Sequence, residues 1–231
     1  MIWHHLMYDV RYIFQYDAFE FFESSIFQKI IHPLLLIGLF MMSGISQSFS
    51  KNNYKRLKKM IIIALGITLI SVAVSIVFQK SFFVFWQIIH SLAFCIAVTL
   101  IIEKIFTTKN TQFIVLLILA LLIIFVIPFV IEKFRLVQHG SFLLLPFGIG
   151  YRNPKVPPMI DYIPVVPLGG FFFIGVMLGK ILYPNGKISQ ERFTGKIWYP
   201  LRFLGKYSLW VYALHQPILI FLIWVYGNVF L

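Results

Sequence analysis

Long apolar segments separated by short polar connections run along the whole chain. An α-helix rises about 1.5 Å per residue, so a segment of roughly 20 residues can cross the roughly 30 Å hydrocarbon core of a bilayer. The alternating short strands that a transmembrane barrel requires are absent from the sequence pattern. The pattern predicts membrane-spanning helices at residues 26–48, 59–78, 83–106, 112–134, 162–183 and 201–230.

The first residues predict the outer half of one further helix. Residues 1–14 are apolar but cover only about half a span. We expect the upstream half to lie outside this sequence, because a chain that began inside the bilayer would leave backbone donors unpaired. The expected fold is an all-α polytopic transmembrane bundle of about seven helices with a partial first helix, forming a single domain over residues 1–231.

Two local features modify the expected bundle. Pro217 lies within the last segment and removes a helical hydrogen-bond donor, so we expect that helix to be broken near this residue. The connection at residues 135–160 is rich in proline and glycine, which predicts an irregular loop on the outer side. We interpret it as a passive connection, and a cap over an acceptor site is the alternative.

Composition and charge support the membrane interpretation. The chain is 60% apolar, 18% aromatic and 12% charged, which excludes a water-soluble globular protein. Much of its net charge of +12 lies in the basic loops 51–59 and 187–206, and short basic loops stay cytoplasmic. Topology therefore explains the charge, and no nucleic acid partner is expected. The same loops can alternatively hold an anionic cofactor or a lipid head group.

The partial first helix carries the strongest candidate for chemistry. His5 and Asp9 are four residues apart, and this spacing places them on one face of a helix near its outer end. A carboxylate one turn away can orient an imidazole, fix its tautomer and raise its basicity. The pair therefore has the arrangement that a general base needs.

Further polar residues are predicted at a similar depth. His90 lies about seven residues inside the fourth helix, and Asp161 marks the outer start of the sixth. Ser208, Tyr212 and His215 share one face of the last helix. Ionisable side chains within membrane helices are functional candidates, and we expect these residues to open toward one cavity in the outer half. The alternative for His90 is a plain hydrogen bond to a neighbouring helix.

The remaining histidines are interpreted as surface residues. His4 is expected to face lipid head groups or water, and His32 to lie at the membrane interface. His139 is expected in the outer loop. None of these three is predicted to take part in catalysis.

Five runs of residues together resemble a known membrane family. A histidine precedes an aspartate by four positions in the first run, and the fourth combines an aspartate and tyrosine with paired prolines. The runs are MIWHHLMYD at 1–9, FMMSGIS at 40–46, WQIIHSLA at 86–93, DYIPVVPLG at 161–169 and LGKYSLWVYALHQP at 204–217. In this order they resemble bacterial relatives of heparan-alpha-glucosaminide N-acetyltransferase.

Three departures from that family limit what the resemblance implies. The family's opening motif, an acidic residue followed by an arginine-glycine pair, is absent, which fits a truncated first helix. Leu168 stands where a tryptophan is common, a change that alters the lining or packing of the outer cavity. The long luminal domain of the animal enzyme is missing too, so heparan sulfate itself is not expected as the substrate.

The resemblance implies acyl transfer across a bacterial plasma membrane. Acetyl-CoA or another acyl-CoA is expected to bind from the cytoplasm as the co-substrate, and an amino sugar or glycan to accept the acyl group outside. The expected catalytic residues are His5, Asp9, His90 and His215. The expected substrate-binding residues are Asp161, Tyr162, Ser208, Tyr212 and Gln216. The expected CoA-binding residues, which would meet the negative charges of its nucleotide end, are Lys55, Arg56, Lys58, Arg202 and Lys206.

Several alternatives stay open at the sequence level. The acyl group can pass directly to the acceptor or through an acetyl-histidine. The intramembrane histidines can instead form a proton or solute pathway in a transporter. A zinc or iron site built from His5, Asp9, His90 and His215 is a third alternative, but no compact ligand motif supports it and no metal is expected. The acceptor, the acyl length and a homo-oligomeric state are left undetermined.

Overall fold

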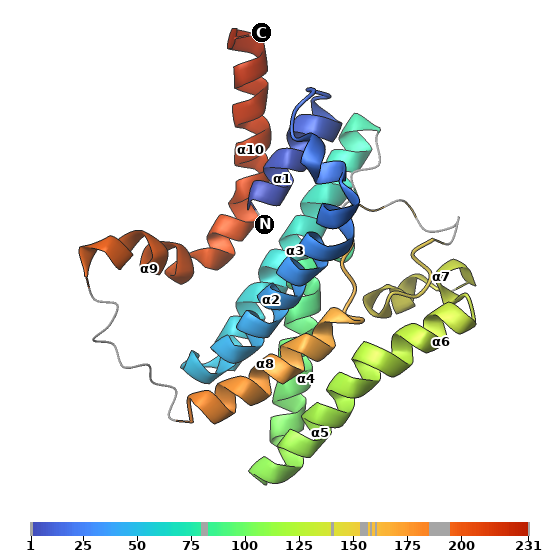
Figure 1. The fold of residues 1–231 in the computed structure, drawn as a ribbon, viewed down its shortest axis with the longest axis vertical. Coiled ribbons are helices and arrows are strands. Elements are labelled where there is room, and N and C mark those ends of the chain that lie inside the picture. The colour runs from blue at the N-terminus through green and yellow to red at the C-terminus, as the bar shows by residue number, and fades with distance from the viewer. Residues whose placement is uncertain are drawn as a thin grey trace. The chain divides into compact units, whose positions relative to one another are not determined.

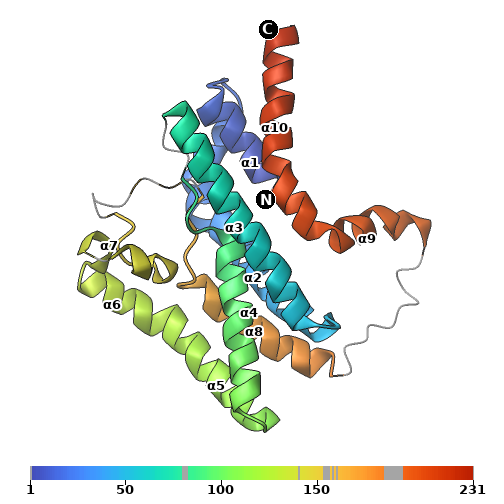
Figure 2. The same cartoon turned by 180° about the vertical axis from the view of Figure 1, so that it is seen from behind.

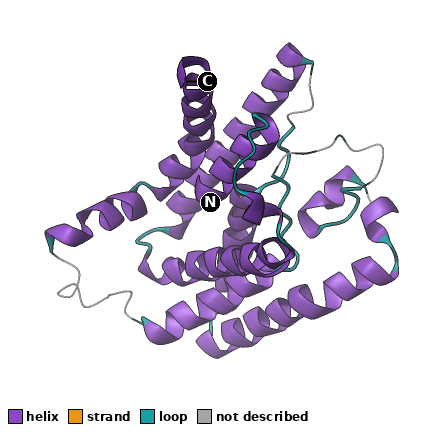
Figure 3. Cartoon of the chain, turned by 45° about the horizontal axis from the view of Figure 1, so that its top comes forward, coloured by secondary structure: helices purple, strands orange, loops and turns teal. Residues whose placement is uncertain are grey.

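The computed structural model describes residues 2–79, 83–139, 141–152, 157, 159, 161–184 and 195–230. Within these residues the chain is helical and forms no β-strand (Figure 3). It divides into two compact units, which we name by their places in the sequence. The terminal unit is Met1–Leu34 with Ser189–Leu231, and the central unit is Leu35–Ile188.

Membrane-spanning helices form where the apolar pattern predicts them. Five helices of the described part are long and apolar enough to cross a bilayer: Phe27–Phe49, Asn53–Val77, Ile88–Ile105, Lys109–Lys133 and Ser208–Asn228. The predicted segment 162–183 also forms a helix, Leu168–Leu182, which is shorter. The prediction of an all-α transmembrane bundle is therefore confirmed, and a single domain over the whole chain stays a prediction.

The central unit is arranged around α4 (Ile88–Ile105) (Figures 1 and 2). Helices α3 (Asn53–Phe78), α5 (Lys109–Leu121) and α8 (Leu168–Leu182) all pack against it. Accordingly, 56% of α4 is buried, against 22% or less of each other described span. The unit also contains most of α2 (His32–Ile45), then η4 (Ser46–Phe49), η5 (Leu122–Val126), α6 (Ile127–Lys133), α7 (Leu136–His139) and η6 (Phe142–Phe147).

The terminal unit joins the two ends of the sequence. Helix α1 (Ile2–Tyr8) lies beside α10 (Ser208–Phe230), as Figures 1 and 2 both show. Met7, Phe22 and Phe27 form a buried apolar cluster that holds α1 against the connection following it. The remaining elements are η1 (Asp9–Ile13), η2 (Glu20–Glu23), η3 (Phe27–Ile31), η8 (Lys196–Trp198) and α9 (Tyr199–Lys206).

An ion pair fixes the turn that follows η1. Arg11 Nε lies 2.8 Å from Glu23 Oε1, and Arg11 Nη1 donates to the carbonyl oxygen of Ala18 at 3.1 Å. The Tyr12 hydroxyl donates to the same carboxylate at 2.9 Å. The hydrogen bonds from Arg11 and Tyr12 lower the pKa of Glu23, so the carboxylate stays ionised and keeps the turn closed.

Helix starts differ from the apolar boundaries because capping side chains set them. Helix α3 begins at Asn53 rather than near residue 59, since Asn52 accepts a hydrogen bond from the backbone N–H of Lys55 at 2.9 Å. Helix α4 begins at Ile88, so His90 is its third residue and not, as expected, a residue seven positions inside it. Hydropathy alone does not detect such caps.

Prolines act differently from the expectation at two places. The sixth helix begins only at Leu168, directly after Pro167, although its apolar run starts six residues earlier. The last segment is divided at Tyr207, between α9 and α10, while α10 continues without interruption through Pro217. The predicted break near Pro217 is therefore wrong, because a helix that loses one internal hydrogen bond can still be held by its neighbouring turns.

The proline-rich connection is more ordered than an irregular loop. It contains the short helices α7 and η6, and η6 ends at Gly148, whose φ of 83° suits glycine. Parts of this connection, including residues 153–156, lie outside the described residues. The prediction is thus wrong for the helical turns at 136–139 and 142–147.

Glycines allow α2 and α8 to touch through their backbones. A Cβ added at Gly44 would overlap the carbonyl oxygen of Phe172, and a Cβ added at Gly175 would overlap that of Met41. Close contact of this kind is a common way to pack helices in membranes, where dispersion replaces the hydrophobic driving force. Gly38 on the same helix α2 has nothing within 4 Å of its added Cβ.

We therefore expect Gly44→Ala to destabilise the central unit, while Gly38→Ala leaves it unchanged or slightly more stable. Overlap with the backbone should lower the free energy of unfolding by about 1–3 kcal/mol, because the backbone of α8 cannot move aside locally. The measurement is thermal unfolding of each variant in detergent. Equal melting temperatures for the two variants would contradict this contact.

Candidate active site

Two buried histidines meet in the terminal unit. The rings of His5 on α1 and His215 on α10 have centroids 4.8 Å apart and are tilted by 58°. Both are nearly excluded from solvent, with exposures of 6% and 7%. Two residues predicted as catalytic from opposite ends of the sequence therefore lie side by side.

A buried carboxylate lies next to this pair along the chain. Asp9 has no exposed surface and begins η1, the π-helical turn that continues α1. Gln216 Nε2 donates to both of its oxygens, at 2.8 Å and 3.0 Å. A carboxylate removed from water needs donors, so this bifurcated contact ties the start of η1 to α10.

The tautomer of His215 follows from its backbone contact. Nδ1 lies within hydrogen-bond distance of the carbonyl oxygen of Tyr212, which can only accept. In neutral His215 the proton is therefore on Nδ1, and Nε2 carries the basic lone pair. The Tyr212 ring packs at a centroid distance of 5.4 Å from the His215 ring. Ser208, predicted on the same face, is exposed at the start of α10.

Two histidines interpreted as surface residues extend the cluster. The ring of His4 stacks on that of His32 at 4.5 Å and lies 5.6 Å from that of His5, centroid to centroid. It also contacts Phe22 of the apolar cluster. His4 and His32 are half-buried rather than fully exposed. Their sequence signal was the adjacency of His4 and His5, which places a second ring on the neighbouring face of α1.

His90 belongs to the central unit and has both ring nitrogens engaged. Thr68 Oγ1 donates to the carbonyl oxygen of Val84 at 2.9 Å, so it accepts from His90 Nε2 at 3.1 Å. His90 Nδ1 in turn accepts from the backbone N–H of Gln87 at 3.4 Å. This geometry favours the alternative in which His90 holds the start of α4, and its catalytic role stays a prediction.

The motif around Asp161 is also held in the central unit. The Tyr162 hydroxyl donates to the carbonyl oxygen of Leu145 at 2.6 Å, and Ser91 Oγ donates to that of Ile163 at 2.6 Å. Asp161 has a φ of 60°, a left-handed conformation that non-glycine residues seldom adopt. The Ser91 bond joins Ile163 to α4, and the Tyr162 bond closes the connection onto η6. A role in acceptor binding is untested.

The basic residues predicted to bind CoA fall in both units. Lys55 and Lys58 are exposed near the start of α3, and Arg202 and Lys206 are exposed on α9. Arg56 differs, because its guanidinium donates to the hydroxyl and carbonyl oxygens of Ser43 at 3.0 Å and 3.3 Å. It thus joins α3 to α2 instead of presenting its charge outward. Lys187 and Arg192 of the second basic loop lie outside the described residues.

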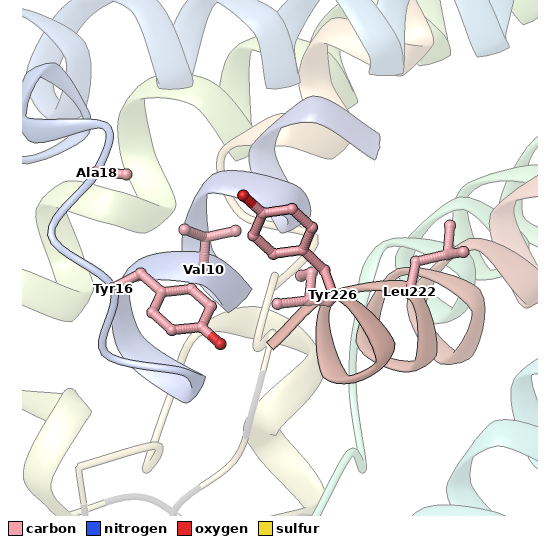
Figure 4. A pocket seen from close by; sticks show the side chains of 6 residues that line it. Val10, Tyr16, Ala18, Leu222 and Tyr226 are labelled. Carbon is pink, nitrogen blue, oxygen red and sulfur yellow. The ribbon is translucent and has the colours of Figure 1, made fainter. Parts of the chain in front are cut away.

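An apolar cavity of about 420 Å³ lies in the terminal unit (Figure 4). Val10, Tyr16 and Ala18 line it from the segment after α1, and Leu222 and Tyr226 line it from α10. Leu222 is seven residues, or about two turns, beyond His215 along α10. None of the predicted site residues lines this cavity.

A cluster of metal ligands is not formed in the part of the chain that the structure describes. No three side chains of His, Cys, Asp or Glu come together there as ligands of one ion would.

Comparison with known proteins places these residues in a family. Residues 1–217 match the family described as heparan-alpha-glucosaminide N-acetyltransferase, catalytic. The match includes the whole histidine cluster, the Asp161 motif and all five runs that carried the resemblance. No curated protein and no solved structure matches the chain. Since the match spans most of its length, the chain belongs to the heparan-alpha-glucosaminide N-acetyltransferase catalytic-domain family.

Proposed function

We propose that the protein is a multi-pass membrane acetyltransferase that moves an acetyl or other acyl group from cytoplasmic acyl-CoA to an amino sugar or glycan outside. The family match supports acetyl transfer, and the apolar helices support a membrane location. The observation that carries the proposal is the buried contact between His5 and His215. A bacterial plasma membrane is the proposed location.

The chemistry needs two proton transfers, and the cluster provides two imidazoles. As the acceptor nitrogen or oxygen attacks the thioester carbonyl, a new bond to carbon forms, the carbon–sulfur bond breaks and the acceptor loses a proton. The departing CoA thiolate then gains a proton. In our proposal one imidazole accepts the first proton and the other supplies the second, so that the pair ends with its original proton count.

The tautomer of His215 extends the general-base role, expected for His5, to both histidines. His215 Nε2 holds the basic lone pair because Nδ1 faces the carbonyl of Tyr212. His215 is therefore as suitable a general base as His5. Asp9, one turn from His5 in sequence, would stabilise the imidazolium that forms, since electrostatic interactions are strong where water is excluded. In this proposal Gln216, whose Nε2 donates to Asp9, positions that carboxylate, and its contact with the acceptor stays a prediction.

Replacing either histidine should abolish transfer without unfolding the protein. We expect His5→Gln and His215→Gln each to slow CoA thiol release from acetyl-CoA, with glucosamine as acceptor, by at least about 100-fold, which is typical for loss of a general acid or base. His139→Gln, at a histidine for which the sequence predicts no catalytic role, serves as the matched control. Turnover unchanged in a folded His5 and His215 variant would refute the roles proposed for the pair.

A mass measurement separates direct transfer from the acetyl-histidine route. With acetyl-CoA alone, a direct transfer leaves the protein unmodified, whereas an acetyl-histidine route adds one acetyl group to an imidazole. Intact-mass spectrometry after rapid mixing measures this mass change. We expect no added acetyl group, because the proposed pair transfers protons; an acetyl group found on His5 or His215 would show the covalent route instead.

The hydrogen bonds between Gln216 and Asp9 lead to a prediction about stability. Gln216→Met should lower the stability by about 1.5–3 kcal/mol, because it removes hydrogen bonds to a buried charge. Adding Asp9→Asn removes that charge, so the double variant should recover part of the loss. Thermal unfolding of the two single variants and the double variant gives the coupling energy. Strictly additive losses would contradict a direct contact.

A further inference from the structure

A second cavity, of about 280 Å³, lies in the central unit. It forms where three parts of this unit meet: the end of α2 with the start of α3, the turn between α4 and α5, and the end of α8. Lysines flank each of these parts in the sequence, which is the charge pattern expected at the cytoplasmic side. The cavity thus opens at the end of the unit from which acyl-CoA is proposed to enter.

Of the two lysines that line this cavity, one is paired with a glutamate and the other is exposed. Lys180 Nζ lies 2.8 Å from Glu103 Oε1 and donates to Gln112 Oε1 at 3.1 Å. Its charge is therefore largely neutralised within the wall. Lys109 also lines the cavity but is exposed, which places it at the rim. The interior therefore combines a paired lysine with apolar side chains, while the rim carries the exposed Lys109.

Three buried polar atoms in the lining have no hydrogen-bond partner in the described part of the chain. They are Gln47 Nε2, Ser48 Oγ and Asn53 Oδ1. Gln47 is 95% buried, being 5% exposed, and Asn53 uses its Nδ2 to donate to the carbonyl oxygen of Gln47 at 3.3 Å. Buried polar groups normally find partners, so this set calls for a ligand that supplies both a donor and an acceptor.

We propose that this cavity binds the pantetheine arm of acyl-CoA through one of its amide groups. A secondary amide offers an N–H to Asn53 Oδ1 and a carbonyl oxygen to Gln47 Nε2. Val176 and Phe113 in the same lining suit the methylene and dimethyl carbons of the arm. Lys109 at the rim is placed for a phosphate oxygen. The inference rests on the proposed function.

The observations favour this ligand over an anion alone. A fully ionised phosphate would offer only acceptors to the unpartnered carbonyl of Asn53, and the Lys180 charge inside is already paired. The inference also adds binding residues that differ from the five basic residues predicted from the sequence. In that set Arg56 is engaged with Ser43.

The test is calorimetric binding to the detergent-purified full chain. The ligands are acetyl-CoA, S-acetylpantetheine and adenosine 3′,5′-bisphosphate, and the variant is Gln47→Met, which keeps the size but removes the amide. Gln138→Met, at an exposed glutamine of α7, is the matched control. We expect Gln47→Met to weaken acetyl-CoA and S-acetylpantetheine about tenfold, equal to roughly 1.4 kcal/mol, and to leave the nucleotide unchanged.

The outcomes separate the inference from the proposed function. Failure of the unaltered protein to bind acetyl-CoA would refute the proposed function itself. Normal acetyl-CoA binding that Gln47→Met does not weaken would overturn only the cavity assignment and leave water as its content. If the variant does not fold, analogues in which either pantetheine amide is replaced by an ester test the unaltered protein. One of these analogues should bind about tenfold more weakly than acetyl-CoA. If both analogues bind as tightly as acetyl-CoA, the inference is overturned.

Discussion

The bifurcated hydrogen bond from Gln216 Nε2 to both oxygens of Asp9 organises the terminal unit. A carboxylate without solvent contact is stable only if donors replace its water, and here the donors come from a residue 207 positions away. Because Gln216 follows His215 directly, the contact that satisfies the charge also fixes the part of α10 that bears the second imidazole. The apolar cluster of Met7, Phe22 and Phe27 supports α1 from the connection that follows it.

The central unit follows a different principle, in which small residues replace charges as the means of close packing. Gly44 and Gly175 let α2 and α8 meet backbone to backbone, and α4 provides the apolar centre. Larger polar side chains remain at the end of these helices, where the Lys180–Glu103 pair links α8 to α4. A tight apolar middle with a polar, incompletely satisfied end is the property that distinguishes this unit from a simple bundle.

Hydropathy located the apolar helices because membrane insertion depends on local composition, although segment 162–183 forms only the shorter helix Leu168–Leu182 and segment 201–230 is divided at Tyr207. Motif order led to the correct family. Contacts between residues far apart in the sequence could not be predicted from hydropathy or motif order. The spacing of His5 and Asp9 indicated a shared face but not that Gln216 would bind the carboxylate, since that pairing requires the packing of α10. Arg56 lies in a basic stretch whose composition indicates surface cations. Its guanidinium nevertheless binds Ser43, which is 13 residues away in the sequence. The start of α4 depended on His90 and Gln87, for which apolar periodicity carries no signal.

A cavity that contacts its ligand through Gln47 and Asn53 would recognise a part that every acyl-CoA shares. Such a contact can secure the donor molecule but is blind to the length of the chain attached to its sulfur. Discrimination between acetyl and longer groups would then fall to the walls around the thioester, and the strength of donor binding and the choice of acyl group could change independently. Substitutions at Gln47 or Asn53 would in that case alter how much donor is bound without altering which group is transferred.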